Sequence, residues 1–176
     1  MRPEYETLGA FGVMALNDNA ESVIKCNDIC NRYGLDTMSV GTTIAWAIEC
    51  YENGILTKED TQGLELTWGN ADSIVAMTQA IADRKGLVAI LVHGSRRAAD
   101  TLKKGEEYLQ IVRGIELPMR DPRFSTYLAR TYQCDPTPGR HVTGGLGIAD
   151  LGVPEEIGFR PEGRGKDDAE TTFAFD

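Results

Sequence analysis

Two carboxylates flank a tyrosine near the start of the chain, in Glu4-Tyr5-Glu6, just before an apolar stretch over residues 8–16. A carboxylate held in apolar surroundings can take up and release protons near neutral pH, as general acid–base catalysis requires. Glu6 is therefore a candidate for proton transfer. The alternative is an acidic pair that is simply solvated.

A tight corner between two predicted helices carries a second candidate site, Gly34-Leu35-Asp36-Thr37. The glycine permits the left-handed stop of the first helix, and Asp36 is placed to cap the second. Backbone N–H groups and a carboxylate at a helix start can receive a ligand phosphate or amine. The same residues also make an ordinary helix cap, so the corner alone does not establish a site.

Residues 113–123 hold three arginines, two acids and two prolines. A rigid segment with that charge density is either an ion-paired joint or a ligand clamp. Residues 135–141, with two prolines, an arginine and a histidine, form a second rigid, cationic turn.

The four cysteines are compatible with either metal binding or burial. Cys26 and Cys30 are four residues apart and would share one helix face. Cys50 and Cys134 complete no zinc or iron–sulfur spacing with them. We therefore expect small apolar core residues, which is the common role of a free cysteine.

Hydrophobic spacing and capping residues predict three long helices, over residues 19–33, 38–53 and 72–85. The second is apolar on almost every side and should be a central, buried helix around Trp46. A helical turn is predicted within 57–63, shorter helices over 87–92, 95–103 and 121–134, extended pieces over 64–68 and 108–112, and a loop over 113–118. The positions predicted to be buried are Val23, Cys26, Cys30 and Tyr33 in the first helix and Ile74, Met77, Thr78 and Ile81 in the third.

Composition narrows the class of protein. Of 176 residues, 41% are apolar and 26% charged, which is typical of a globular domain rather than a disordered chain. The 18 Lys and Arg against 27 Asp and Glu give a net charge of −9, which argues against nucleic acid or an anionic membrane as partner. No apolar run reaches the roughly 20 residues of a membrane span, and no secretory signal is visible. We expect a cytoplasmic protein.

Six motifs, in order and at compatible spacing, carry a resemblance to a known family: PEYETL, CNRYGLDTMSVGTTIA, LELTWGN, KGLVAILVHGSRRAA, VRGIELPMRDPR and CDPTPGRH. Together they resemble the tungsten-containing aldehyde ferredoxin oxidoreductases. The resemblance implies a mainly α fold, as in the helical domains 2 and 3 of that family. It covers residues 1–145, and residues 146–176 are expected to form an irregular tail rich in glycine and acids.

The resemblance also implies roles for particular residues. Tyr5 and Glu6 match the family's pair beside the tungsten and are the implied catalytic residues. The family's pterin-binding motif matches Asn31, Gly34, Leu35 and Asp36, followed by Thr37, with Asn31 in place of the usual aspartate. Arg113 matches a family cation that contacts the pterin. No metal ligand is implied in this chain.

Two departures from the family pattern bear on activity. Ile111 stands where the family has a histidine, and isoleucine cannot transfer a proton. The family's cluster cysteines and its N-terminal pterin cradle have no counterpart in these residues. We therefore expect a fragment or split subunit of an enzyme that oxidises aldehydes to carboxylic acids with ferredoxin as electron acceptor. The alternatives are a diverged member that reduces another substrate and a non-catalytic helical scaffold.

In the complete enzyme the implied cofactors are a bis-pterin tungsten (or molybdenum) centre and a 4Fe-4S cluster. The isolated chain is expected to be inactive and to bind neither stoichiometrically. Its implied partners are the remaining N- and C-terminal parts of the enzyme, ferredoxin and an aldehyde.

Overall fold

The computed structural model describes residues 2–85, 87–123 and 126–140, and it is mainly helical, as predicted. The chain divides into two compact units, one ending at Met119 and the other beginning at Arg120. The elements in chain order are α1 (Tyr5–Leu8), the π-helix η1 (Gly9–Val13), α2 (Ala20–Tyr33), α3 (Thr37–Glu52), α4 (Ala71–Asp83), the 3-10 helix η2 (Leu87–His93), α5 (Ser95–Leu102), the 3-10 helix η3 (Glu106–Tyr108), β1 (Ile111–Val112), β2 (Ile115–Glu116) and α6 (Thr126–Cys134).

The corner between α2 and α3 forms as its residues predict. Gly34 ends α2 in the left-handed region at φ 68°, and the N–H of Leu35 donates to the Cys30 carbonyl at 2.8 Å. Asp36 caps α3, its carboxylate accepting from the N–H of Met38 at 3.0 Å. These bonds turn the chain from one helix into the next within three residues.

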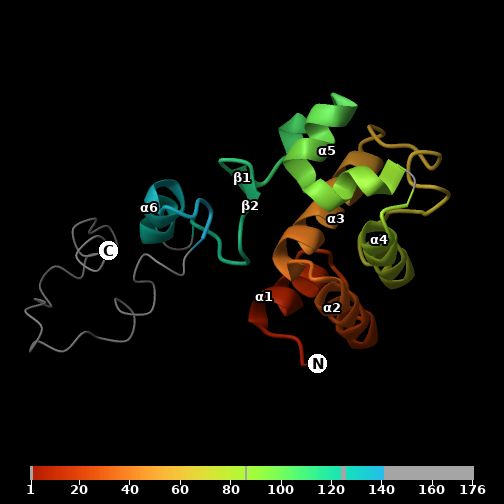
Figure 1. Cartoon of the computed structure of the whole chain (residues 1–176), viewed down its shortest axis with the longest axis horizontal. Helices are drawn as coiled ribbons and strands as arrows, with labels where there is room; N and C mark the ends of the chain where they lie inside the picture. Colours follow the sequence, from red (N-terminus) through yellow and green to blue (C-terminus); the bar gives the residue numbers. More distant parts are fainter. Residues whose placement is uncertain (1, 86, 124–125, 141–176) are drawn as a thin grey trace, which may run out of the picture. The chain divides into compact units, whose positions relative to one another are not determined.

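Helix α3 is the centre of the first unit, with every residue from Val40 to Ile48 buried. The indole of Trp46 is 3% exposed, and its N–H donates to the carbonyl oxygen of Gly105 at 2.7 Å. Figure 1 shows α1 at one end of α3 and α5 at the other, with α2 and α4 alongside. The prediction of a central, buried helix is confirmed.

The start of α3 packs closely against η1. A Cβ built on Gly41 would lie 2.6 Å from the Cβ of Ala10, so only a glycine lets the two backbones approach this far. A Cβ on Gly9 would likewise lie 2.6 Å from the Met119 side chain. These two glycines place η1 between α3 and the segment that follows β2.

The segments between the long helices match the predictions in part. Residues 57–63 contain a single helical turn, in which the N–H of Thr61 donates to the Thr57 carbonyl at 3.1 Å and Asp60 accepts from the N–H of Thr57 at 2.8 Å. Residues 64–67 belong to no strand, although they alternate in polarity. Of the extended piece predicted over 108–112, Ile111 and Val112 form β1, whereas Tyr108 is in η3. The predicted loop over 113–118 contains β2, and Ile111 of β1 pairs with Glu116 of β2 in a hairpin. Arg113 and Gly114 form its turn with φ of 49° and 84°.

Three further differences concern helices. No helix was predicted over residues 5–13, where the structure has α1 and then η1, whose π-turn departs from the 3.6-residue repeat of an α-helix. Tyr33, predicted to be buried, is 51% exposed, and Ile29 is buried instead. Helix α6 begins at Thr126 rather than at residue 121, because Asp121 accepts from the N–H of Arg123 in a local turn. The other predicted core positions of α2 and α4 are buried.

The second unit is described from Arg120 to Arg140, apart from residues 124–125. Tyr132 is 2% exposed, and its hydroxyl donates to the Arg120 carbonyl at 2.9 Å. Asp135 makes the predicted turn by accepting from the N–H of Thr137 at 2.7 Å. His141, the predicted tail and the predicted boundary at residues 145–146 lie outside the described residues.

Candidate functional site

Helix α1 carries both candidate catalytic residues, and both bind the backbone of Met119. The N–H of Met119 donates to Oε2 of Glu6 at 2.6 Å, and the hydroxyl of Tyr5 donates to the Met119 carbonyl at 3.0 Å. Glu6 is 9% exposed and Tyr5 58%. A charge-assisted bond of this length fixes the Glu6 carboxylate in one position. Glu6 is thus a buried, held carboxylate rather than a solvated one.

Helix α1 also contacts the corner between α2 and α3. The hydroxyls of Thr7 and Thr37 lie 2.9 Å apart, and Thr7 is 1% exposed. Glu4 caps α1, accepting from the N–H of Thr7 at 3.1 Å. The structure therefore brings together two segments that are 30 residues apart in sequence and that the sequence analysis selected separately.

The corner itself presents polar groups to solvent. Asp36 is exposed, and its two oxygens accept from the Met38 N–H and the Ser39 hydroxyl. A carboxylate offers about four acceptor positions, so Asp36 can accept from a ligand amine while it caps α3. No atom lies within 4 Å of a Cβ built on Gly34, which leaves open space beside the corner. These residues fit a ligand with amine donors, such as a pterin ring.

Asn31 lies one turn before the corner. Its Nδ2 group donates to the carbonyl and the side-chain oxygen of Asn27, at 2.7 and 3.0 Å. Its Oδ1 oxygen accepts from no group in the described part of the chain. Asn31 is exposed.

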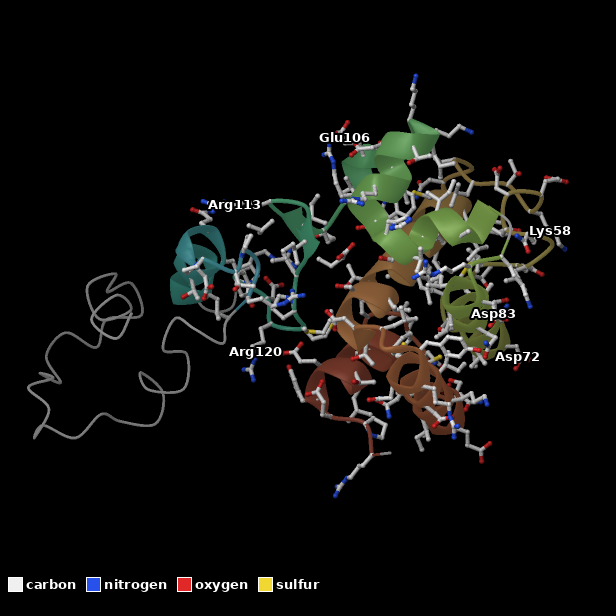
Figure 2. All side chains as sticks on the ribbon, viewed as in Figure 1. Lys58, Asp72, Asp83, Glu106, Arg113 and Arg120 are labelled. Atoms are coloured by element: carbon white, nitrogen blue, oxygen red, sulfur yellow. The ribbon has the colours of Figure 1, made fainter. Side chains whose placement is uncertain are left out.

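Arg113 is not brought to this site. It occupies the turn of the β1–β2 hairpin, is exposed, and lies well apart from α1 in Figure 2. Ile111, at the expected histidine position, is half-buried in β1. Within the predicted clamp over residues 113–123, the backbone of Met119 binds α1.

Glu116 has a structural role that its sequence position did not predict. This carboxylate is 4% exposed, and its Oε1 accepts from the N–H and the hydroxyl of Ser95 at 2.8 and 2.9 Å. The Thr43 hydroxyl donates to the same oxygen at 3.4 Å. Glu116 therefore caps α5 and ties β2 to α3, which fixes the strand that leads to Met119. The only sign of its burial in the sequence was its position between two apolar residues, Ile115 and Leu117.

The described cysteines do not fit an iron–sulfur cluster. Cys26, Cys30 and Cys50 are buried in the core, as expected. Burial raises the thiol pKa of Cys26 to about 11 and those of Cys30 and Cys50 to about 12, whereas a metal binds the thiolate. Among the residues that the structure describes, no three His, Cys, Asp or Glu side chains are grouped to hold a metal ion.

Over the described ranges, the longest and most apolar helices still fall short of what is needed to cross a membrane.

Comparison with known proteins identifies the family. The family described as "Aldehyde ferredoxin oxidoreductase, domains 2 & 3" matches residues 1–174. The tungsten-containing aldehyde ferredoxin oxidoreductases of Pyrococcus abyssi and Thermococcus kodakarensis are 36% and 37% identical over 144 and 142 residues. Each alignment covers 80% of this chain and 23% of the relative.

A relative with a different name also matches. The WOR-like subunit of an aliphatic sulfonate oxidoreductase from Pyrococcus furiosus is 33% identical over 97 residues, which is 55% of this chain and 15% of that protein. The chain spans about a quarter of the length of the aldehyde ferredoxin oxidoreductases it matches. By the extent of the family match, this chain belongs to the aldehyde ferredoxin oxidoreductase family, in the region that forms domains 2 and 3.

Proposed function

We propose that this chain is the helical part of a tungstopterin enzyme that oxidises aldehydes to carboxylic acids and passes the electrons to ferredoxin. The remaining parts of the enzyme come from polypeptide outside these residues. The names of the relatives support the substrate and metal classes. The observation that carries the proposal for this chain is the placement of α1, which joins a held carboxylate to the candidate pterin corner.

In this proposal the corner binds the pterin. Asp36 and the Oδ1 oxygen of Asn31 accept from ring amines, and Gly34 with Leu35 allows the ring to approach the backbone. Thr37 links the corner to α1 through the hydroxyl of Thr7. Arg113, which lies apart from α1, would contact a more distant part of the cofactor, such as a phosphate.

Glu6 would accept one of the two protons that the reaction releases. Oxidation of an aldehyde to an acid takes an oxygen atom from water and releases two protons and two electrons. The bound tungsten centre supplies the electron-accepting chemistry. Glu6 is buried, fixed by Met119, and placed on the same short helix as Tyr5, whose hydroxyl donates to the Met119 carbonyl. A positioned carboxylate of this kind is suited to general base catalysis.

A second candidate is a related reaction on another substrate. Ile111 favours it, because this position carries no group that can transfer a proton. The sulfonate oxidoreductase subunit among the relatives shows that a protein of different name shares this sequence region. The two candidates have the same pterin corner and differ in the substrate.

The test is a chimera in which this chain replaces the matching region of the Pyrococcus furiosus tungsten-containing aldehyde ferredoxin oxidoreductase. The proposal expects bound tungsten and pterin, and ferredoxin reduction by aldehydes. Tungsten without aldehyde turnover would favour the second candidate, and a folded chimera without tungsten would leave only a scaffold.

A substitution separates ligand binding from helix capping. Asp36→Ser removes the carboxylate and keeps a good N-cap residue, so the chimera should stay folded and lose pterin and tungsten. Asn70→Ser is the matched control, because Asn70 caps α4 in the same way, away from the corner. Equal cofactor content in the two variants would contradict the role of Asp36.

A further inference from the structure

Glu116 is a buried carboxylate that the proposed reaction does not use. Its Oε1 oxygen accepts from the N–H and the hydroxyl of Ser95 on α5 and from the hydroxyl of Thr43 on α3. Gly94 leaves room for this oxygen, because a Cβ built on Gly94 would lie 2.7 Å from it. A carboxylate is costly to bury, and charge-assisted bonds of this kind offset the cost. Glu116 therefore fixes the end of β2 against α3 and α5.

Residues 116–119, which we call the Glu116 arm, are a stiff connection. The N–H of Leu117 donates to the Gln110 carbonyl at 3.3 Å. As the residue before a proline, Leu117 is also confined to extended conformations. Pro118 is buried, and its ring fixes its own φ. Because each residue between the two ends of the arm is constrained, the position of Glu116 is transmitted to the far end.

The far end of the Glu116 arm is Met119, which α1 and η1 hold by both its backbone and its side chain. Its N–H donates to Oε2 of Glu6 at 2.6 Å, and its carbonyl accepts from the Tyr5 hydroxyl at 3.0 Å. Its side chain lies against Gly9, where a Cβ would come within 2.6 Å of it. The arm is thus fixed at both ends, and one of the fixing groups is the carboxylate to which the proposed function assigns proton transfer.

We propose that Glu116 is a positioning residue for Glu6, because it anchors the arm that presents the Met119 N–H to the Glu6 carboxylate. The inference rests on the proposed function, in which Glu6 accepts a proton. Without the anchor the arm would shift, and Glu6 would lose the donor that holds its carboxylate in one place. A displacement of about 1 Å at a reacting group can lower a rate about 10²-fold. Glu116 acts through Met119 and is not itself a catalytic residue.

Amide hydrogen exchange tests the anchor in the isolated chain, without reference to activity. The chain has five methionines, so isotope labelling of methionine alone resolves the Met119 amide beside that of Met77, a residue inside α4 that is 1% exposed. In Glu116→Ala, exchange of the Met119 amide should rise at least about tenfold relative to that of Met77. Glu116→Gln keeps an oxygen that accepts from the Ser95 N–H, so this ratio should change by less than about threefold.

Trp46→Phe is the control for a general loss of stability. It removes a buried hydrogen bond in the same unit, but that bond goes to Gly105 rather than to the Glu116 arm. The Met119 and Met77 amides should therefore exchange faster in step. A Met119 amide that gains no more than the Met77 amide in Glu116→Ala would overturn the proposal.

A milder variant keeps the test decisive if Glu116→Ala does not fold. Ser95→Ala removes one hydroxyl donor to Glu116 and leaves the carboxylate and the Ser95-position N–H in place. The exchange of the Met119 amide relative to that of Met77 should then rise at least about twofold. An unchanged ratio in this variant would count against the anchor in the same way.

Turnover of the tungsten-loaded chimera tests whether the anchor matters to the reaction. Glu116→Ala should lower kcat for aldehyde oxidation by about 10–100-fold, because the proton-accepting group is displaced. KM and tungsten content should stay within about twofold, because binding is not affected. Glu116→Gln should keep kcat within about threefold of the unsubstituted chimera, and Trp46→Phe within about twofold at a temperature where it is folded.

The two proposals fail in different ways. If kcat of Glu116→Ala stays within about twofold although its Met119 amide is released, the positioning role is overturned and the proposed function stands. If the unsubstituted chimera binds tungsten but does not oxidise aldehydes, the proposed function is overturned, and the exchange ratio still decides whether Glu116 anchors Met119 at Glu6.

Discussion

Trp46→Phe isolates one hydrogen bond at the centre of the fold. The Trp46 N–H donates to a buried carbonyl, that of Gly105, at 2.7 Å. Phenylalanine keeps an aromatic ring but leaves the carbonyl without its partner, at a cost of about 1–3 kcal/mol. The smaller ring leaves a cavity that costs a further ~1 kcal/mol. The free energy of unfolding should therefore fall by about 2–4 kcal/mol, and Trp46→Ala should cost about 3–5 kcal/mol.

Trp68→Phe is the matched control. Trp68 also donates its indole N–H, to Oε2 of the exposed Glu52 at 2.8 Å, but the bond lies at the surface. Its loss should cost less than about 1 kcal/mol. Both indoles are in the unit that ends at Met119, so urea unfolding of the two variants reports on the same unit.

Tryptophan fluorescence can follow the unfolding of both variants. The chain has two tryptophans, so each variant leaves one indole as the fluorescent probe. Emission from Trp46 in the Trp68→Phe variant should be the more blue-shifted, because this ring is buried. Unfolding free energies within about 0.5 kcal/mol of each other would refute the central placement of Trp46 and its bond to Gly105.

Three further predictions concern packing, capping and pH. In thermal melts, Gly41→Ala should destabilise the chain by about 1–3 kcal/mol, because the added Cβ would meet η1. Gly12→Ala is the control and should be neutral or slightly stabilising, because no atom lies closer than 3.6 Å to its added Cβ. Glu116→Ala should lower the free energy of unfolding in urea by at least about 2 kcal/mol, because it leaves the Ser95 N–H and hydroxyl in the first turn of α5 without their acceptor. Glu106→Ala should lower it much less, because Glu106 is exposed. Equal losses in the two variants would exclude the capping role of Glu116. Burial raises the pKa of the three core thiols above the ordinary 9.0, so their contribution to stability is complete below about pH 9 and is lost as the pH rises toward 11–12. In a Cys134→Ser chain at about pH 9.5, thiolate absorbance should therefore appear only on unfolding, and its presence in the folded chain would contradict the buried core.

The helices around the corner could be predicted because local signals and packing agree there. Gly34 ends α2 and Asp36 caps α3, as predicted, and Asn19 and Asn70 cap the helices predicted over residues 19–33 and 72–85. The spacing of apolar residues in α4 likewise matched its buried face. Where a cap and a stripe fall together, the sequence determines the helix almost to the residue.

The remaining features depend on contacts between distant segments. The π-turn of η1 is held by the approach of Ala10 to Gly41, 31 positions later, which no local period reveals. The charged segment over residues 113–123 predicts an ion-paired joint or a ligand clamp, but not that Glu116 binds Ser95 of α5, which lies 21 positions earlier. Tyr33 continued an apolar stripe in the sequence, but at the end of α2 its ring is exposed, with its hydroxyl 3.2 Å from Oδ1 of Asp83.

The candidate site also combines locally predictable residues with a contact between distant segments. Its residues could be selected one segment at a time, but the bond between Glu6 and the Met119 backbone joins positions 113 residues apart and could not be foreseen. That bond also makes a clean substitution available. In Glu6→Gln the amide oxygen can still accept from the Met119 N–H, so the side chain stays in place while its capacity to take up a proton is lost.

The most direct test of the proposed role is turnover of the tungsten-loaded chimera with Glu6→Gln. Glu4→Gln is the control, because Glu4 is exposed, caps α1 and retains an acceptor oxygen as glutamine. We expect Glu6→Gln to lower aldehyde oxidation by about 10²–10⁴-fold at unchanged tungsten content, with Glu4→Gln close to the unsubstituted chimera. Turnover of Glu6→Gln within about a factor of two of the unsubstituted chimera would contradict it, and would leave Glu6 as a carboxylate that only fastens α1 to Met119.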